Sequence, residues 1–303
     1  MINAGLRYFA AVARHGSIRE AAEELHVAQS ALSRQIQKLE EELGAPLFQR
    51  HARGVELTSA GEILLGFAQT ILRQVEKVRS EVDALKGLRR GSVHIFAIES
   101  LVPHLLPQVI ARFSRRYPGI NFVISIDGSD RVVAAVREGR ADIGFTYYAP
   151  PDPELAMVFK VRAPLIAAMS AQHPLAGKSK VSLAECAAYP IAAPMPNTGS
   201  RIVIDMACKA SGVHLKPKLE SNSVPLRLEF LHTGNGITFI PRISIWGKLR
   251  AGELVAVPIR ERVANTSTID AVTHVSRHLP LAAEEFLRAV QGELQSLRSS
   301  EAA

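Results

Sequence analysis

The spacing of apolar residues divides the chain into an N-terminal helical part and a longer part in which strands and helices alternate. Residues 59–88 contain no proline and carry apolar side chains at steps of three, four or seven, which predicts one long helix. Its apolar positions are Ile63, Leu64, Phe67, Ile71, Leu72, Val75, Val78, Val82 and Leu85. A helix of this length seldom packs only against one small domain, so a dimerisation seam is favoured and a core helix is the alternative.

From Gly91 onward, short β-branched runs alternate with helical stretches. Strands are predicted at 93–98, 120–126 and 142–146, and helices at 106–117 and 131–139. The order then restarts with an apolar run at 165–169, helices at 201–210 and 224–232, a strand at 237–240 and a final helix from about 281 to 297. This order is typical of α/β domains with parallel strands. We expect two α/β halves that share a hinge rather than one large sheet.

Upstream of the long helix, the sequence has the pattern of two helices joined by a tight turn. Ser17 and Glu20 have the spacing of a capping box, which opens a first helix that runs to residue 25. Residues 26–28 form the turn. The second helix covers about 29–43 and ends at Gly44, a residue suited to a helix C-cap.

The second helix has one apolar stripe and one polar face. The stripe consists of Leu32, Ile36, Leu39 and Leu43, and the polar face of Ser30, Ser33, Arg34, Gln37 and Lys38. A recognition helix enters the major groove with its N-terminal end first, so Gln29, Ser30 and Ser33 are placed to approach base edges. Glutamine can pair with adenine and arginine with guanine, while Lys38 would hold phosphate. The alternative, a solvated amphipathic helix, does not explain the preceding helix and turn.

Residues 45–58 contain two short extended runs around a basic, glycine-containing tip. This pattern predicts a β-wing, with Arg50 and Arg53 placed for the phosphate backbone or the minor groove. A surface hairpin with incidental arginines is the alternative. Either Thr58 or Ser59 then caps the long helix.

Charge and composition refine this picture only slightly. The chain has 303 residues, of which 47% are hydrophobic and 21% charged, as expected for a globular protein of two or three domains. A net charge of +7 permits a polyanionic partner. Residues 1–60, however, hold seven Lys/Arg and seven Asp/Glu, so charge alone does not locate a DNA site. The same balance argues against a nucleoid-type protein that binds DNA mainly by charge.

Several other classes of protein lack support in the sequence. No apolar run reaches the roughly 18 to 20 residues that span a bilayer, and the N-terminus lacks the layout of a signal peptide, so we expect a cytoplasmic protein without a membrane partner. Cys186 and Cys208 are expected to be structural and unpaired rather than a redox pair. His274 and His278 do not have metal-site spacing with a Cys or acidic partner. Without a phosphate loop, Gly-x-Ser-x-Gly or dinucleotide motif, we expect no enzyme, metal or cofactor.

Residues 6–61 resemble the LysR-type family of bacterial transcriptional regulators, and the match is dense. The matching positions are Leu6, Phe9, Val12, Gly16, Ser17, Ala21, Ala22, Leu25, Val27, Gln29 to Ile36, Leu39, Glu40, Leu43, Gly44, Leu47, Phe48, Arg50, Arg53, Gly54, Leu57, Thr58 and Gly61. One departure is Ser30, where the family commonly has proline; we expect the fold to tolerate it. The remainder resembles the family less specifically, at 105–107, 113–118, 139–143 and 234–241.

The resemblance implies a chain of α+β and α/β class in three parts. These are a winged helix-turn-helix at 1–58, a linker helix at 59–88 and a periplasmic-binding-protein-like (type 2) effector domain at 91–303, with subdomain I at 91–162 and 269–303 and subdomain II at 163–268. It further implies a sequence-specific regulator that dimerises through the linker helix, is often tetrameric, and commonly represses its own gene. The implied partners are double-stranded promoter DNA, a small-molecule effector and RNA polymerase.

Open α/β sheets bind ligands beyond the carboxyl ends of their strands. The candidate effector residues in such places are Ser100, Leu101, Ser129, Thr146, Asn197, Thr198 and Arg201. Because hydroxyls and N–H groups at a helix N-terminus suit an anion, we expect a carboxylate or another small anion, with Arg201 as its counter-charge. Alternatively, Thr198 or Ser200 only caps the helix and Arg201 is solvated.

A two-lobed domain of this kind also suits a solute-binding protein or a small-molecule enzyme. Neither explains the helix-turn-helix, and the absence of an export signal disfavours the first. We therefore expect a ligand-responsive DNA-binding regulator in which the effector changes the angle between the two lobes. For this to work, the effector must bind the two arrangements with different affinity.

Overall fold

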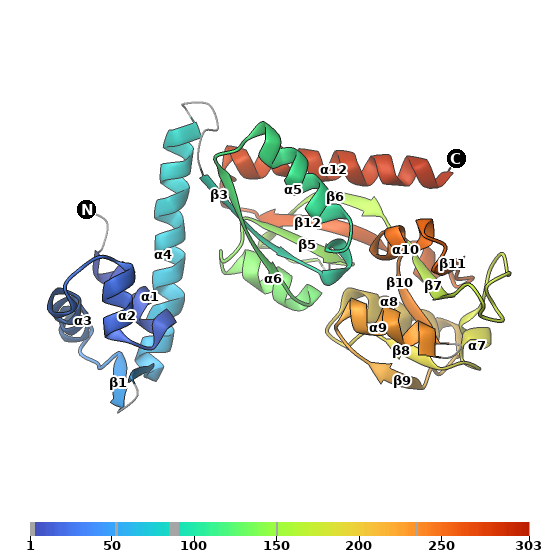
Figure 1. Ribbon diagram of the computed structural model, residues 1–303, viewed down its shortest axis with the longest axis horizontal. Coiled ribbons are helices and arrows are strands. Elements are labelled where there is room, and N and C mark those ends of the chain that lie inside the picture. The colour runs from blue at the N-terminus through green and yellow to red at the C-terminus, as the bar shows by residue number, and fades with distance from the viewer. Residues whose placement is uncertain (1–3, 52–53, 85–90, 150, 234–235, 303) are drawn as a thin grey trace. The chain divides into compact units, whose positions relative to one another are not determined.

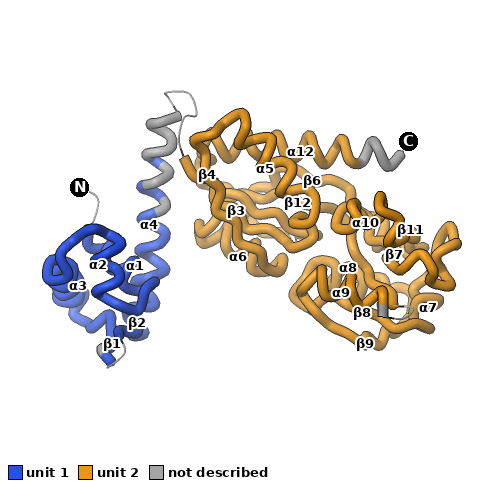
Figure 2. Tube along the Cα trace, viewed as in Figure 1, with its two compact units in different colours: residues 1–82 blue, residues 83–303 orange. Residues whose placement is uncertain are grey.

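The computed structural model describes residues 4–51, 54–84, 91–149, 151–233 and 236–302. These residues form two compact units, residues 1–82 and 83–303 (Figure 2). Each unit has its own hydrophobic core.

The first unit is a helical domain with a small β-hairpin. Its elements are α1 (Ala4–His15), α2 (Ile18–Glu24), α3 (Gln29–Leu43), β1 (Phe48–His51), β2 (Gly54–Leu57) and α4 (Ser59–Ala84). The first three helices and the start of α4 enclose an apolar cluster in which Phe9, Leu32 and Leu47 are fully buried. Phe9 packs on Phe48 with ring centroids 5.1 Å apart, which fastens the hairpin to α1. The predicted end of the long helix, beyond Ala84, lies outside the described residues.

The helix boundaries in this unit follow from local caps. The Ser17 hydroxyl accepts a hydrogen bond from the Glu20 N–H at 3.3 Å, as the first half of the predicted capping box requires. The Glu20 carboxylate itself lies near His15, with 3.9 Å between Oε2 and Nδ1. Helix α3 ends at Gly44, whose φ of 66° is left-handed and therefore favours glycine. The prediction that Leu43 belongs to a buried stripe is wrong: its side chain is 53% exposed, because α3 has run past the core by its last residue.

The hairpin is pinned to the loop between α1 and α2. Strands β1 and β2 pair antiparallel, with Phe48 opposite Leu57. The Val55 N–H donates to the Gly16 carbonyl at 2.8 Å. A Cβ at Gly54 would lie 2.4 Å from the same carbonyl oxygen, and its φ is 142°, so this close approach requires glycine.

Of the two predicted caps for α4, Thr58 is the one that acts. Its hydroxyl accepts from the Gly61 N–H at 3.0 Å and donates to the Pro46 carbonyl at 2.6 Å. We expect Thr58→Ala to lower the free energy of unfolding of this unit by about 1 kcal/mol, since it removes an N-cap. The matched control is Ser59→Ala, which should change stability by less than about 0.5 kcal/mol. Urea unfolding followed by circular dichroism measures both, and equal effects of the two substitutions would contradict the assignment.

The second unit contains two five-stranded mixed sheets. In lobe I the strand order is β4 (Ile120–Ile126), β3 (Gly91–Ala97), β5 (Ile143–Tyr147), β12 (Thr268–His274), β6 (Leu155–Arg162). In lobe II it is β11 (Leu254–Pro258), β7 (Leu165–Ser170), β10 (Ile237–Pro241), β8 (Ile191–Ala193), β9 (Pro217–Glu220). The predicted parallel pairing is confirmed for β3 with β4 and β5 and for β8 with β9 and β10. It is wrong for β7, which runs antiparallel to β10 and β11, and β12 also runs antiparallel to β5 and β6. Strand β12 does so because it brings the chain back from lobe II.

Helices cover both sheets. Those of lobe I are η1 (Glu99–Leu101), α5 (Leu105–Arg116), α6 (Ser129–Arg137) and α12 (Leu281–Ala302). Those of lobe II are α7 (Leu183–Cys186), α8 (Gly199–Ser211), α9 (Val224–Phe230), η2 (Leu231–Thr233), η3 (Arg242–Ile245), α10 (Trp246–Arg250) and α11 (Arg262–Asn265). In Figure 1, α5 and α12 lie on one side of the lobe I sheet and α6 lies on the other.

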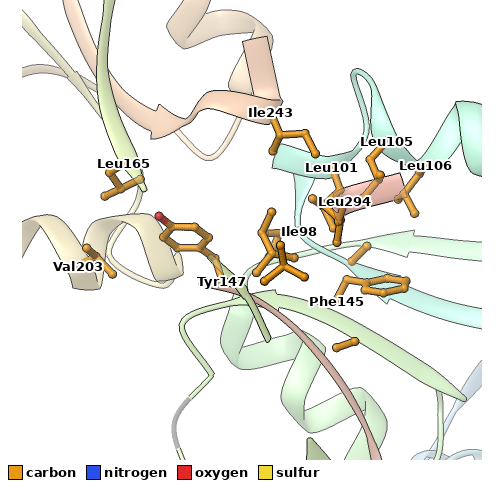
Figure 3. Packing of buried hydrophobic residues seen from close by; sticks show 14 of the residues in the cluster. Ile98, Leu101, Leu105, Leu106, Phe145, Tyr147, Leu165, Val203, Ile243 and Leu294 are labelled. Atoms are coloured by element: carbon orange, nitrogen blue, oxygen red, sulfur yellow. The ribbon is translucent and has the colours of Figure 1, made fainter. Parts of the chain in front are cut away.

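The chain crosses between the lobes twice, after β6 and before β12, and Tyr147 holds the two crossings together. Its hydroxyl donates to the Ala163 carbonyl on the first crossing and lies 2.6 Å from the Ser267 Oγ on the second. Burial raises the pKa of Tyr147, so the hydroxyl keeps its proton. Apolar residues of both lobes surround this tyrosine in one continuous cluster (Figure 3).

Candidate nucleic-acid interface and ligand cleft

The polar residues of α3 that sequence reasoning selected lie in the structure as follows. Ser33 is half-buried; the exposed ones are Gln29, Ser30, Arg34, Gln37 and Lys38. The opposite side of the helix is held in the core by Leu32 and Ile36. Because the N-cap residue is Ala28, its side chain cannot accept from the first-turn N–H groups, an arrangement that suits phosphate, although the Ala31 N–H donates to the Ala28 carbonyl at 3.0 Å.

Several acidic side chains of this unit are already bound to partners within it. Arg14 binds Glu24 at 2.5 Å and Arg19 lies 3.3 Å from Glu23, so these acids already have basic partners on α1 and α2. The Glu40 carboxylate accepts the Leu47 N–H at 2.8 Å. Within the described part of the chain, Arg34 has no ion-pair partner. The neutral charge count of this domain therefore conceals a free cation on the exposed face of α3.

The two arginines of the predicted wing lie at or beyond the edge of the described residues. Arg50 lies in β1, paired with Val55 across the hairpin, but its side chain is outside the described residues. Arg53 lies at the tip and is also outside them. The roles of both arginines stay predictions.

Helix α4 carries two apolar faces. Leu64, Leu65 and Ala68 pack against the core of the first unit. A second row is exposed to solvent and consists of Ile63, Phe67, Ile71 and Val78. At about 100° per residue these four lie within one stripe, which borders the core-facing row. The apolar positions predicted for this helix thus fall into two groups, one packed in the core of the domain and one exposed to solvent. The side chains of Val82 and Leu85 lie outside the described residues.

A cavity of about 350 Å³ lies between lobes I and II of the second unit, within the range of small-molecule sites. Lobe I contributes Glu99, Ser100 and Asp127 to its polar lining. Lobe II contributes Thr198, Ser223 and Arg227. A ligand here would touch both lobes at once, so its affinity would depend on their separation.

Of the seven predicted effector residues, only Ser100 and Thr198 line this cavity. Leu101 is fully buried in the core. Thr146 is fully buried because side chains alternate along β5 and its neighbour Tyr147 takes the cavity side. Asn197 is exposed and not among the described lining residues. The Thr198 hydroxyl also caps α8, accepting from the Arg201 N–H at 3.4 Å, as the alternative reading proposed.

Ser129 joins the lobes instead of facing the cavity. Its hydroxyl accepts from the Gly199 N–H of lobe II at 3.2 Å and donates to the Tyr147 carbonyl at 3.3 Å. A Cβ at Gly199 would lie 1.8 Å from that carbonyl oxygen, so this contact between lobes requires glycine.

Arg201, the predicted counter-charge, is already engaged elsewhere. Its guanidinium contacts Asp205 at 2.9 Å, Glu220 at 2.5 Å and the Pro194 carbonyl at 3.0 Å. Burial opposes its charge, but the hydrogen bonds that it donates to Glu220 and Asp205 outweigh burial and raise the pKa of Arg201. Arg201 does not occur among the described lining residues of the cavity.

The cationic group of the cavity is Arg227, which sequence reasoning missed. Its side chain is only 3% exposed, and Nη1 donates to the Thr238 Oγ1 at 3.1 Å. Nε is buried without a hydrogen-bond partner among the described residues. Burial lowers the pKa of Arg227 to about 10, an effect that the charge of Glu99 opposes, and the group stays positive at neutral pH. The available signal was an arginine within the buried stripe of α9, at the i+3 position after Val224.

The two cysteines are not primed for oxidation. Cys186 is fully buried, and burial raises the pKa of its thiol to about 12. Burial also raises the pKa of Cys208, which is half-buried in α8. Thiolate is the reactive form, and neither group is thiolate-rich at neutral pH.

The described ranges contain neither a helix suited to a membrane nor a cluster of side chains suited to a metal ion. None of the helices there combines the length and the apolar composition needed to cross a bilayer. Nor do three or more His, Cys, Asp or Glu side chains in those ranges gather as a metal ion would require.

Comparison with known families gives two matches along the chain. Residues 4–62 match a model described as the bacterial regulatory helix-turn-helix protein of the lysR family. Residues 86–295 match the LysR substrate binding domain. Together they cover both units.

Individual relatives point the same way. A RuBisCO operon transcriptional regulator of Acidithiobacillus ferrooxidans is 29% identical over 255 residues, which is 84% of this chain and 82% of that protein. A hydrogen peroxide-inducible genes activator of Pectobacterium carotovorum subsp. carotovorum is 30% identical over 244 residues, 79% and 80% of the two chains.

Two solved structures share the fold. CbnR in complex with its target DNA has a TM-score of 0.71 at 23% identity and covers 96% of this chain and 99% of that one. A full-length OxyR variant from Pseudomonas aeruginosa has a TM-score of 0.74 at 23% identity, with 96% and 95% covered. At this identity the likeness concerns the fold alone.

Proposed function

The chain belongs to the LysR family of bacterial transcriptional regulators, and we propose that a compact anion bound between lobes I and II changes how its helix-turn-helix holds promoter DNA. The observation that carries this proposal is the buried, unpartnered Nε of Arg227 at the wall of the cavity between the lobes. A buried guanidinium N–H without an acceptor costs free energy, and an anionic ligand that accepted from it would recover that free energy.

The proposed DNA reader is the exposed face of α3. Gln29, Ser33 and Arg34 would approach base edges, since they lie on the N-terminal half of a helix that follows a helix and tight turn. Lys38 would bind phosphate; its side chain is 3.9 Å from Glu42, a surface pair too weak to hold it away from DNA. Arg50 and Arg53 of the wing would add backbone or minor-groove contacts.

We propose that the chain works as a dimer through α4. The exposed row Ile63, Phe67, Ile71 and Val78 is an apolar stripe with heptad-like spacing, which a second copy of the same helix could bury. A two-fold dimer would present two recognition helices to two half-sites. Assembly of two dimers into a tetramer is a further proposal.

The effector would be a small anion, a carboxylate or a phosphate ester. Arg227 would supply the charge and the hydroxyls of Ser100 and Ser223 would supply hydrogen bonds, since all three line the cavity. Because both lobes contribute, effector affinity and lobe angle would be coupled reciprocally. We propose no catalytic step and no cofactor. RNA polymerase is a proposed partner, and the cytoplasm, where bacterial promoters are, is the proposed compartment.

Selection from a random duplex library, followed by binding titration on the enriched site, tests the DNA-reading proposal. We expect Arg34→Ala to weaken binding to the enriched site about tenfold or more, as loss of one base contact predicts. Binding to a scrambled duplex should weaken less, because phosphate contacts dominate there. Arg19→Ala is the matched control, an exposed arginine of α2 that pairs with Glu23. If both variants lost affinity equally on both duplexes, α3 would not be the reader.

A further inference from the structure

A carboxylate of lobe I fastens lobe II at the wall of the cavity. Glu99 belongs to the short helix η1, and its Oε2 accepts a hydrogen bond from the Val224 N–H at 2.6 Å. Val224 is the first residue of α9 in lobe II. This bond therefore joins the two lobes through one flexible side chain.

Helix α9, whose first N–H group binds Glu99, also carries the cationic group of the cavity. Arg227 lies three residues after Val224, almost one helical turn further along α9. The negative charge of Glu99 acts to raise the pKa of Arg227, so the two groups interact electrostatically. Glu99, Val224 and Arg227 all line the cavity. The Glu99 carboxylate, which joins the two lobes, is thus also a counter-charge for the buried guanidinium of Arg227.

An anion that paired with Arg227 would meet an unfavourable charge balance. The described lining already contains two acids, Glu99 and Asp127, and one base, Arg227. A further negative charge in a partly dry cavity is repelled by both carboxylates. Asp127 accepts the N–H of its own neighbour Gly128 at 2.8 Å and stays within lobe I. Glu99 is the acid that can leave, because it is half-buried on a one-turn helix and its carboxylate binds lobe II rather than its own lobe among the described residues.

We propose that Glu99 is a built-in competitor of the effector: its carboxylate latches lobe I to α9 of lobe II, and an anion bound to Arg227 displaces it and opens this latch, so that the lobes move about their remaining contacts. This inference rests on the proposed anion site and adds the step by which occupancy becomes movement. The displaced carboxylate returns when the anion leaves, so the latch biases the protein toward the arrangement it has when empty.

The chain contains its own reporter of this movement. Trp246 is the only tryptophan in the sequence and lies at the start of α10 in lobe II. Its ring faces His104 of lobe I, with centroids 6.1 Å apart. His104 directly precedes α5, a few residues after Glu99. Separation of the lobes would change the surroundings of this indole and hence its emission.

The experiment compares the full-length protein with its Glu99→Gln variant, using inorganic phosphate and malonate as probe anions. Glutamine keeps an acceptor for the Val224 N–H but has no charge. We expect Glu99→Gln to bind the better probe roughly tenfold more tightly by calorimetry, since one like charge is removed. We expect Glu99→Ala without any probe to have the Trp246 emission of wild type saturated with that probe. Preference for phosphate or for malonate identifies the chemical source of the anion.

Asp127→Asn is the matched control, because it removes a like charge from the same cavity without touching the bond between lobes. It should raise probe affinity less than about threefold and leave the emission of the empty protein unchanged. Equal gains from Asp127→Asn and Glu99→Gln, or unchanged affinity in Glu99→Gln, would overturn the latch. If wild type bound a probe but no Glu99 variant differed from it, only the latch would fail. If no probe bound to wild type or to Glu99→Gln, the proposed anion site would fail and the latch with it.

Discussion

Substitution of Phe67 by aspartate should convert the protein into a folded monomer whose affinity for its operator is at least about a hundredfold lower. Phe67 lies on α4 with 67% of its side chain exposed, in the stripe that also contains Ile63 and Ile71. In a two-fold dimer each copy would contribute this position to the same interface, so two carboxylates would be buried without partners. Loss of the second DNA-binding head removes the gain in effective concentration that links two half-sites.

The matched control is Gln69→Asp, which adds the same charge to the same helix. Gln69 is exposed but lies off the apolar stripe, about 200° around the helix from Phe67. It should leave the oligomer and its operator affinity nearly unchanged. Light scattering during gel filtration measures the oligomeric state, and titration of a two-half-site duplex measures affinity. A Phe67→Asp protein that stayed dimeric would place the interface elsewhere.

The helix-turn-helix was predictable almost to the residue because its determinants are local. The expected bounds of the recognition helix, residues 29–43, are those of α3, and its glycine C-cap is confirmed by a left-handed φ at Gly44. Capping and turn residues act over three or four positions, so a single sequence contains them. The resemblance to LysR-type regulators is confirmed by the two matching families, and the expected fold class is confirmed with it.

The cleft was less predictable because its groups meet across long sequence separations. Glu99 and Val224 are 125 positions apart, and no local pattern links them. The helix N-terminus before Arg201 looked like an anion site, yet this arginine is neutralised by Asp205 and by Glu220 on a neighbouring strand. The antiparallel strand β12 was missed for the same reason, since its neighbours lie more than a hundred residues earlier in the sequence. Arg227 is the exception, because a charged residue within an apolar stripe is a signal that the sequence does contain.

Substitution of Arg227 distinguishes a structural role of this residue from a ligand-binding role. Arg227→Met should reduce affinity for the better of the two probe anions, phosphate or malonate, by about a hundredfold or more. A charge-assisted, two-point contact to a guanidinium is worth about 3 kcal/mol, which corresponds to that factor. At the same time, stability should stay constant or rise, because methionine fills much of the volume without burying a charge. Among the described residues, the side-chain hydrogen bond lost would be the one to Thr238.

The control for this substitution is Arg201→Met, which removes the counter-charge that the sequence suggested. Its guanidinium is held by Asp205 and Glu220, so we expect probe affinity to stay within about threefold of wild type. Calorimetry gives the affinities and urea unfolding gives the stabilities. A large loss of stability in Arg227→Met, with unchanged anion binding, would make Arg227 a structural residue. Loss of binding at constant or higher stability would mean that the buried guanidinium is kept for a ligand that the sequence alone did not reveal.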